Sequence, residues 1–245
     1  MQHSVRLQPD SALFLDFDGT LAALALRPEL VDVDEQVISF LSRINDCLGG
    51  AVAILTGRPI SQIDGFLHPL ALPAAGLHGL EWRSTAAADP VRAKASPDLQ
   101  YLRRSVEASG LLADGIMLED KGAAIALHYR SVPHLEGALE AYLTRVLTGL
   151  PDLHVLRGKM VMEVKPATHD KGLALRQFME LPPFRGRVPV FAGDDVTDED
   201  AMAAALALGG SALKVGEGPT CAPARLPDVA AVTDWLAQQV RHLTA

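Results

Sequence analysis

The sequence has few cysteines and few aromatic residues. Its 245 residues include two cysteines, Cys47 and Cys221, and 5% aromatic side chains. The two cysteines lie far apart and neither belongs to a Cys-x-x-Cys pair, which argues against a disulfide framework of the secreted type. We therefore expect two free thiols in the reducing cytoplasm. Residues 1–10 contain no basic segment followed by an apolar run, so we expect no signal peptide.

Basic residues are also scarce. The chain has 22 Lys and Arg against 30 Asp and Glu, which gives a formal net charge of −8. No window gathers the basic residues into a stripe of the kind that binds phosphate backbones, so we expect neither nucleic acid nor an anionic membrane as a partner. The longest uncharged stretches, residues 65–80 and 201–213, are too short or too rich in proline and glycine to span a bilayer. With 49% hydrophobic residues, the composition is that of a globular protein.

Short apolar runs alternate with helical patterns towards both ends of the chain. The runs predicted to be strands are Ala12–Phe17, Ala51–Leu55, Val188–Ala192, Ala212–Val215 and Val229–Val232. The predicted helices, with apolar residues at three- and four-residue spacing, are Asp34–Cys47, Pro59–Phe66, Gly172–Glu180, Asp198–Leu208 and Asp234–His242. This alternation predicts an α/β fold with a doubly wound, Rossmann-like parallel sheet.

The pattern changes between about Ser84 and Val164. A helix is predicted near residues 98–109, strands near 115–119 and 123–129, a helix near 132–150, and strands near 154–156 and 161–164. This repeated helix-strand-strand order predicts a small α+β domain inserted into the core. We therefore predict a core made of residues 1–84 and 164–245, and an inserted domain made of residues 85–163.

Two carboxylates follow the first predicted strand. Asp16 and Asp18 lie within Leu13–Thr20, where the first apolar run ends. In an open α/β sheet, ligands bind at the carboxyl ends of the strands. An isolated Asp-x-Asp-Gly segment also occurs in plain turns, and that alternative stays open for these residues taken alone. A calcium loop is excluded because the further ligands of such a loop do not follow.

Two cationic residues lie near predicted helix starts. Thr56, Gly57 and Arg58 follow the second strand and lead into a helix. Backbone N–H groups and the helix dipole bind phosphate at such a place; the alternative is an ordinary connection with Thr56 as the N-cap. Lys171 lies at the start of a later helix, where a cation opposes the helix dipole. This locally unfavourable position indicates another use.

Five acidic residues occur within seven positions after the strand at 188–192. We expect Thr197 to cap the following helix, whose positive end then accommodates the acids at 198–200. Asp194 and Asp195 come before that helix, and carboxylates crowded there have raised pKa values unless a cation is present. A hard divalent ion explains the cluster, and magnesium fits an oxygen-only site.

The polar residues described above follow one another in a fixed order at the ends of predicted strands or the starts of predicted helices: Asp16 and Asp18, then Thr56, then Lys171, then the acids from Asp194. This order resembles the haloacid dehalogenase superfamily, whose pattern is Asp-x-Asp-Gly-Thr, a later Thr or Ser, a Lys and a Gly-Asp-Asp-x-x-Asp box. The inserted segment is similar to the larger α/β cap of that superfamily. The resemblance implies a Rossmann-like haloacid dehalogenase core with an inserted α+β cap domain.

Further segments resemble the trehalose-6-phosphate phosphatase family. Gly76–Glu81 is similar to its G-x-H-G-x-E segment, and residues 193–199 are similar to its GDDxTDE box. Residues 119–121, 128–130 and 158–163 resemble its sugar-binding cap positions in spacing. The resemblance runs from Ala12 to Leu236 with every catalytic motif intact. We expect an enzyme without the synthase-like domain that some members carry.

The resemblance implies a magnesium-dependent phosphatase that converts trehalose 6-phosphate to trehalose and phosphate, with a functional link to trehalose-6-phosphate synthase. Asp16 would attack phosphorus and become an aspartyl-phosphate, and Asp18 would protonate the leaving oxygen and then activate water. Thr56 and Lys171 would hold the phosphoryl oxygens. The implied magnesium ligands are Asp16, the Asp18 main-chain carbonyl and Asp194, with Asp195 and Asp198 binding the ion either directly or through a neighbour.

The resemblance also implies a set of residues that contact the substrate. These are Gly57, Arg58, His78, Glu119, Lys121, Arg130, Lys159, Glu163 and Asp198. Polar groups buried against a sugar discriminate strongly between substrates. The alternative for the charged residues of the inserted domain is a set of surface ion pairs, and for His78 it is a hydrogen bond inside the core.

Two other functions stay open on the sequence. One is a phosphatase for another sugar phosphate, such as sucrose 6-phosphate or a mannosyl-phosphoglycerate. The other is a catalytically silent sugar-phosphate sensor or a regulatory partner of the synthase. The intact acids at Asp16, Asp18 and Asp194 argue against the silent protein.

Overall fold

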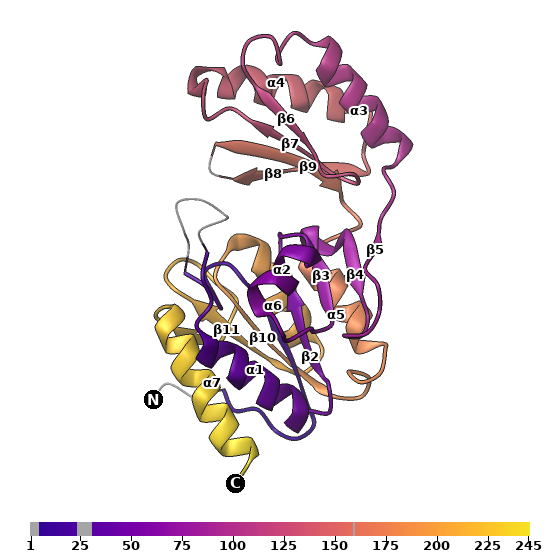
Figure 1. Cartoon of the computed structure of the whole chain (residues 1–245). Helices are drawn as coiled ribbons and strands as arrows, with labels where there is room; N and C mark the ends of the chain where they lie inside the picture. The colour runs from indigo at the N-terminus through magenta and orange to yellow at the C-terminus, as the bar shows by residue number, and fades with distance from the viewer. Residues whose placement is uncertain (1–4, 24–30, 159) are drawn as a thin grey trace. The chain divides into compact units, whose positions relative to one another are not determined.

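A computed structural model describes residues 5–23, 31–158 and 160–245 of the chain. The chain divides into two units, one formed by Met1–Val91 with Asp170–Ala245 and the other by Arg92–His169. Figure 1 shows both units coloured along the chain from the N- to the C-terminus. Within the described residues, every helix is too short or too polar to cross a bilayer.

The first unit is built on an eight-stranded sheet in the order β12-β11-β10-β1-β2-β3-β4-β5. The strands are β1 (Ser11–Leu15), β2 (Val52–Leu55), β3 (Ala74–Gly76), β4 (Glu81–Arg83), β5 (Val91–Arg92), β10 (Val188–Gly193), β11 (Ser211–Val215) and β12 (Ala224–Leu226). All pairs from β12 to β3 are parallel, whereas β3 and β4 are antiparallel. Every residue of β1 and β2 is buried, as expected for parallel strands whose two faces are covered.

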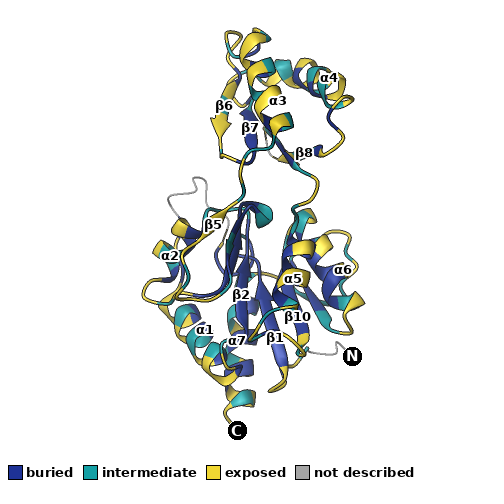
Figure 2. Ribbon diagram, turned by 90° about the vertical axis from the view of Figure 1, so that its right-hand side faces the viewer, coloured by how far each residue is buried: buried dark blue, intermediate teal, exposed yellow. Residues whose placement is uncertain are grey.

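Helices cover both faces of this sheet. They are α1 (Glu35–Cys47), α2 (Ile60–Leu67), α5 (Lys171–Met179), α6 (Glu199–Ala207) and α7 (Val229–Leu243). Helix α1 packs against α7, and α5 packs against α6. Figure 2 shows the first pair on one side of the sheet and the second pair on the other. The predicted doubly wound α/β arrangement is therefore confirmed.

The second unit has its own sheet and its own core. Its four antiparallel strands lie in the order β6-β7-β9-β8. The elements are α3 (Pro97–Ala108), β6 (Met117–Asp120), β7 (Ile125–His128), η3 (Pro133–Leu135), α4 (Glu136–Leu147), β8 (Leu153–Gly158) and β9 (Val161–Pro166). Leu99 of α3 and Leu139 of α4 are buried together with Ile125 of β7 in this core. The predicted helix-strand-strand repeat is confirmed.

One predicted strand is wrong. Val229–Val232 forms the first turn of α7, because the Asp228 carboxylate accepts a hydrogen bond from the Ala231 backbone N–H at 2.8 Å and caps a helix there. A four-residue apolar run does not distinguish a strand from a buried helix turn. The strands β3, β4, β5 and β12 are also not predicted from the sequence, since each is only two or three residues long.

The start of β11 depends on a glycine. A Cβ atom on Gly210 would stand 1.9 Å from the Pro189 backbone oxygen of β10. Only glycine therefore lets the chain enter the sheet beside the strand that leads to Asp194.

We expect Gly210→Ala to lower the free energy of unfolding by about 1–3 kcal/mol, because the added methyl group overpacks a backbone contact. Gly65→Ala is the control, since a Cβ there meets open space inside α2 and should stabilise by up to about 1 kcal/mol. Urea unfolding followed by tryptophan fluorescence isolates this unit, because both tryptophans, Trp82 and Trp235, lie in it. Equal stability of the two variants would contradict the account of β11.

Candidate active site

Three neighbouring parallel strands end at one edge of the sheet and carry polar residues there. β1 lies between β2 and β10. Asp16 follows β1, Thr56 follows β2 and Asp194 follows β10, so the topology brings together segments that are far apart in the sequence. The Asp16 backbone N–H donates to the Ala192 carbonyl of β10 at 2.9 Å, which fixes the strand ends relative to one another.

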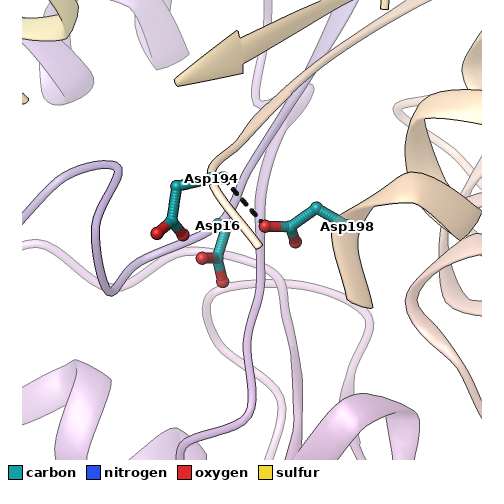
Figure 3. A group of neighbouring side chains, drawn as sticks. All are labelled: Asp16, Asp194 and Asp198. Atoms are coloured by element: carbon teal, nitrogen blue, oxygen red, sulfur yellow. Dashed lines mark hydrogen bonds between the residues drawn. The ribbon is translucent and has the colours of Figure 1, made fainter. Parts of the chain in front are cut away.

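Asp16, Asp194 and Asp198 form a carboxylate cluster. One oxygen of each carboxylate lies within 4.8 Å of the other two, and Figure 3 shows the three side chains converging. Asp16 and Asp198 are buried, with 4% and 0% of their surface exposed. Three acids this close repel one another unless positive charge compensates them.

Lys171 supplies one such charge. It begins α5, as the sequence predicts, and its buried Nζ donates to Asp16 Oδ1 at 2.7 Å and to Asp198 Oδ1 at 2.6 Å. Burial alone would lower the pKa of Lys171, but the two carboxylates more than offset this and raise it, so the ammonium form is held. The unfavourable place of this lysine in its helix is explained by the ion pairs.

Asp198 is held from two sides. Its Oδ1 accepts from Lys171, while its Oδ2 accepts from the backbone N–H groups of Asp194 and Asp195, both at 2.9 Å. The dashed line in Figure 3 marks the bond from the Asp194 backbone N–H to Asp198. Asp198 therefore ties the segment after β10 to the lysine and fixes the backbone at Asp194 and Asp195.

The remaining acids of the cluster are under-compensated. Burial, then the nearby Asp198 carboxylate, raises the pKa of Asp16 well above its usual range, although Lys171 opposes this. Burial, then Asp198 and Asp195, raises the pKa of Asp194 to about 6. Since one ammonium group contacts two of the three carboxylates and Asp194 has no such contact with it, the cluster keeps an excess of negative charge. An all-oxygen donor set with this excess fits a hard divalent cation.

Two glycines allow the acids to come this close. Gly19 has a φ of +74°, and a Cβ atom on it would stand 2.1 Å from Asp194 Oδ2. A Cβ on Gly193 would stand 2.4 Å from Asp198 Cγ. Gly19, the glycine of the Asp-x-Asp-Gly segment, therefore allows the positive φ of its own turn and also leaves room for Asp194.

Asp18 and Arg58 form an ion pair at the same edge. Arg58 Nε lies 2.6 Å from Asp18 Oδ2, and Arg58 Nη2 lies 2.7 Å from Asp18 Oδ1. The buried Thr56 hydroxyl accepts from the Arg58 backbone N–H at 3.1 Å. Thr56 is not the N-cap of α2, because that helix begins at Ile60 and its N-cap is Pro59.

His78 lies against Gly57. A Cβ on Gly57 would stand 2.7 Å from His78 Nε2, and His78 itself has a φ of +54°. Its backbone N–H donates to the Thr56 carbonyl at 3.0 Å. The G-x-H-G-x-E segment is thereby placed beside the loop that follows β2.

The segment after β10 departs from its predicted capping. Thr197 does not cap a helix; Asp195 is the N-cap of the short helix η4 (Val196–Asp198), and its carboxylate accepts from the Val196 N–H at 2.6 Å. Asp195 is exposed and lies outside the carboxylate cluster. The prediction for Thr197 is wrong because the chain turns two residues earlier, where Asp195 and Asp198 form a capping box.

Two further residues support the site: Lys214, which no sequence motif includes, and Glu81, the last residue of the G-x-H-G-x-E segment. Lys214 is buried in β11, and its Nζ donates to the Asp194 carbonyl at 2.5 Å. Buried Glu81 accepts from the Ile60 N–H at 2.6 Å and so caps α2 from another strand. A lysine inside an apolar strand is the one sequence signal that could have indicated Lys214.

The second unit brings together part of the predicted sugar-binding set. Lys121 Nζ lies 2.5 Å from Glu163 Oε2, and both side chains are largely buried. Ala126 pairs with Glu119 on one side and with Glu163 on the other, so the two acids lie in one row across the sheet. His128 Nε2 and Glu119 Oε2 lie 2.9 Å apart. Arg130 is exposed, and Lys159 lies outside the described residues.

The raised pKa of Asp194 makes the stability of the metal-free protein depend on pH. Between the ordinary pKa of 3.8 and about 6, the folded protein keeps a proton that the unfolded chain loses. The free energy of unfolding should therefore fall as pH rises through this window. Asp194→Asn should flatten that fall, whereas Asp195→Asn should change it much less.

Urea unfolding in the presence of a chelator, repeated across the window, measures both slopes. Added Mg²⁺ should raise the stability of the wild type most above pH 6, where Asp194 is ionised. An Asp194→Asn variant with an unchanged slope would contradict this assignment.

Comparison with known proteins identifies the family. A family model described as trehalose-phosphatase matches residues 14–216. Trehalose-6-phosphate phosphatase of Escherichia coli (strain K12) is 38% identical over 227 residues, which cover 92% of this chain and 85% of the relative. A bifunctional trehalose-6-phosphate synthase/phosphatase of Thermoproteus tenax is 32% identical over 92% of this chain and 31% of its own length.

Solved structures show the same fold. The C-terminal domain of a Candida albicans trehalose-6-phosphate phosphatase has a TM-score of 0.79 at 19% identity, covering 96% of this chain and 93% of that one. A phosphatase of the haloalkanoate (HAD) superfamily from Bacteroides thetaiotaomicron has a TM-score of 0.67 at 20% identity, covering 95% and 94%. The family match extends over most of the chain, and this chain belongs to the trehalose-phosphatase family.

Proposed function

We propose that this protein hydrolyses trehalose 6-phosphate to trehalose and phosphate through an aspartyl-phosphate on Asp16. The observation that carries the proposal is the placement of the buried Asp16 carboxylate, which meets Lys171 and two further acids at the strand ends of a trehalose-phosphatase chain. A nucleophile of this kind needs a fixed orientation and nearby positive charge, and Asp16 has both.

The reaction has two balanced steps. Asp16 attacks phosphorus while the bond to the sugar oxygen breaks, and that oxygen takes a proton from Asp18, which enters this step as the carboxylic acid and leaves it as the carboxylate paired with Arg58. A water molecule then attacks the phosphorus, Asp18 accepts its proton, and the Asp16 carboxylate is released together with phosphate. Asp18 lies two residues from the nucleophile at the same strand end, so one carboxyl group serves both proton transfers.

Thr56 and Lys171 are proposed to hold the transferring oxygens. Phosphoryl transfer is accelerated mainly by positioning and charge stabilisation. Lys171 keeps its proton under the influence of two acids, and Thr56 is fixed by its bond to the Arg58 N–H. Gly57, His78 and the loop they share are proposed to line the phosphate end of the site.

The proposed cofactor is Mg²⁺. Asp16, the Asp18 main-chain carbonyl and Asp194 would hold it, while Asp198, occupied by Lys171 and two N–H groups, would orient Asp194. The place of Asp195 as a ligand stays a prediction, since its carboxylate caps η4. When bound, the ion supplies charge stabilisation to the transferring phosphoryl group.

The two parts of the chain are proposed to divide the work. Residues 1–84 and 164–245 would form the catalytic core, and residues 85–163 would form the cap that selects the sugar. Glu119, Lys121, Arg130, Lys159 and Glu163 are the proposed sugar contacts. The Lys121–Glu163 pair supports this, because it places a cationic donor beside a carboxylate acceptor.

The synthase is the proposed metabolic partner. The Thermoproteus tenax relative carries both activities in its name on one chain, and a synthase would supply the substrate here. Free thiols at Cys47 and Cys221 fit a cytoplasmic reaction.

A substrate panel tests the reaction. Phosphate release should be fastest from trehalose 6-phosphate, compared with sucrose 6-phosphate, mannosyl-phosphoglycerate and glucose 6-phosphate, and a chelator should abolish it until Mg²⁺ is restored. Asp16→Asn should lower turnover by roughly three orders of magnitude or more without unfolding the protein. Faster phosphate release from another sugar phosphate would make that compound the substrate in place of trehalose 6-phosphate. No phosphate release from any of them would favour a sensor.

Glu163→Ala tests the cap assignment. It should lower kcat/KM for trehalose 6-phosphate by roughly 10- to 100-fold, because Lys121 and a sugar hydroxyl lose their acceptor, while p-nitrophenyl phosphate, which has no sugar, is affected little. Glu140→Ala is the matched control, since it breaks an exposed ion pair with Arg157 in the same unit. An equal loss on both substrates would show that Glu163 is structural.

A further inference from the structure

Arg58 is directed at Asp18. The sequence places this arginine among the substrate contacts, at a helix start suited to phosphate. We infer instead that Arg58 is a positioning residue for the proposed acid and base: it holds the Asp18 carboxylate in the orientation from which protons are exchanged. This inference rests on the proposed function, because it gives Asp18 the proton-transfer role.

The contact between the two side chains is bidentate. Nε and Nη2 of Arg58 each donate to a different oxygen of Asp18, at 2.6 and 2.7 Å. Two parallel bonds fix the plane as well as the position of a carboxylate. This edge of the guanidinium is also the one that would grip a phosphate, so in this arrangement Asp18 occupies it.

The guanidinium is itself held in place. Its carbon lies 5.2 Å from the centroid of the Phe66 ring and 5.8 Å from that of Phe17, and these two rings stack on each other at 5.4 Å. Nη1 donates to Gln62 Oε1 at 3.2 Å. The side chain of Arg58 is 12% exposed, against 30% for Asp18. Arg58 is thus the more constrained partner, so we take Arg58 to fix the orientation of the Asp18 carboxylate and not the reverse.

The main chain of Arg58 is tied to the same site. Its N–H donates to Thr56 Oγ1 at 3.1 Å, and its carbonyl accepts from the Leu77 N–H at 3.1 Å. A Cβ on Gly76 would stand 2.7 Å from that carbonyl oxygen, so β3 packs directly on the arginine backbone. The orientation of the Asp18 carboxylate therefore depends on β2, on β3 and on the stacked rings of Phe17 and Phe66, all of which hold Arg58.

A double-mutant cycle tests the inference. Arg58→Met should lower kcat for trehalose 6-phosphate by roughly 10- to 100-fold, the cost of misplacing a catalytic group, with little change in KM. Asp18→Asn should lower kcat further. Because Arg58 acts through Asp18, the double variant should be no slower than Asp18→Asn within about twofold. A double variant slowed by the product of the two single effects would overturn the inference.

Inhibition by inorganic phosphate separates positioning from direct phosphate binding. The inhibition constant should stay within about twofold of the wild type in Arg58→Met and in Arg58→Lys, and Arg58→Lys should still show a lowered kcat, since lysine cannot make the bidentate contact. A loss of phosphate inhibition in Arg58→Met that Arg58→Lys restores would instead make Arg58 a phosphate ligand. If the wild type cleaves p-nitrophenyl phosphate but not trehalose 6-phosphate, the proposed substrate fails, and the same cycle on p-nitrophenyl phosphate still decides the role of Arg58.

Discussion

The site depends on one buried contact, the Lys171 ammonium group between the carboxylates of Asp16 and Asp198. Without it, two buried acids would face each other and Asp194 across less than 5 Å, and neither would have an ammonium partner. With it, Asp16 is fixed in direction and Asp198 is free to hold two backbone N–H groups through its second oxygen. Breaking a buried pair of this kind typically costs about 3–5 kcal/mol, so geometry and stability are linked here.

This contact also explains features that look unrelated in the sequence. Lys171 is 155 positions from Asp16 and 27 from Asp198, and the three meet because α5 begins beside the ends of β1 and β10. Gly19 and Gly193 lack side chains where the acidic segments cross. The excess negative charge that remains in the cluster suits a divalent ion. Part of the chain's net negative charge is therefore gathered at the site.

Much of the core could be predicted from sequence, because parallel strands buried on both faces leave continuous apolar runs and their polar ends stand out. Asp16, Thr56 and Asp194 are visible in this way, whereas Lys171 stands out by its unfavourable position at a helix start. The partner of Arg58 is not, since a local pattern indicates a phosphate site equally well and only the fold brings Asp18 to it. The roles of Lys214 and Glu81 likewise depend on register between strands. Val229–Val232 was misassigned because the cap at Asp228 outweighs a short apolar run.

The central claim is that Asp16 carries the phosphoryl group between the two steps. It is tested most directly by quenching the Asp18→Asn variant in acid during turnover of p-nitrophenyl phosphate with Mg²⁺ and mapping the modified peptide by mass spectrometry. The leaving group of this substrate needs no proton from Asp18, so the first step still proceeds. We predict phosphate on Asp16, accumulated because the second step lacks its base. Phosphate on another residue, or continued turnover with an unmodified Asp16, would contradict the account.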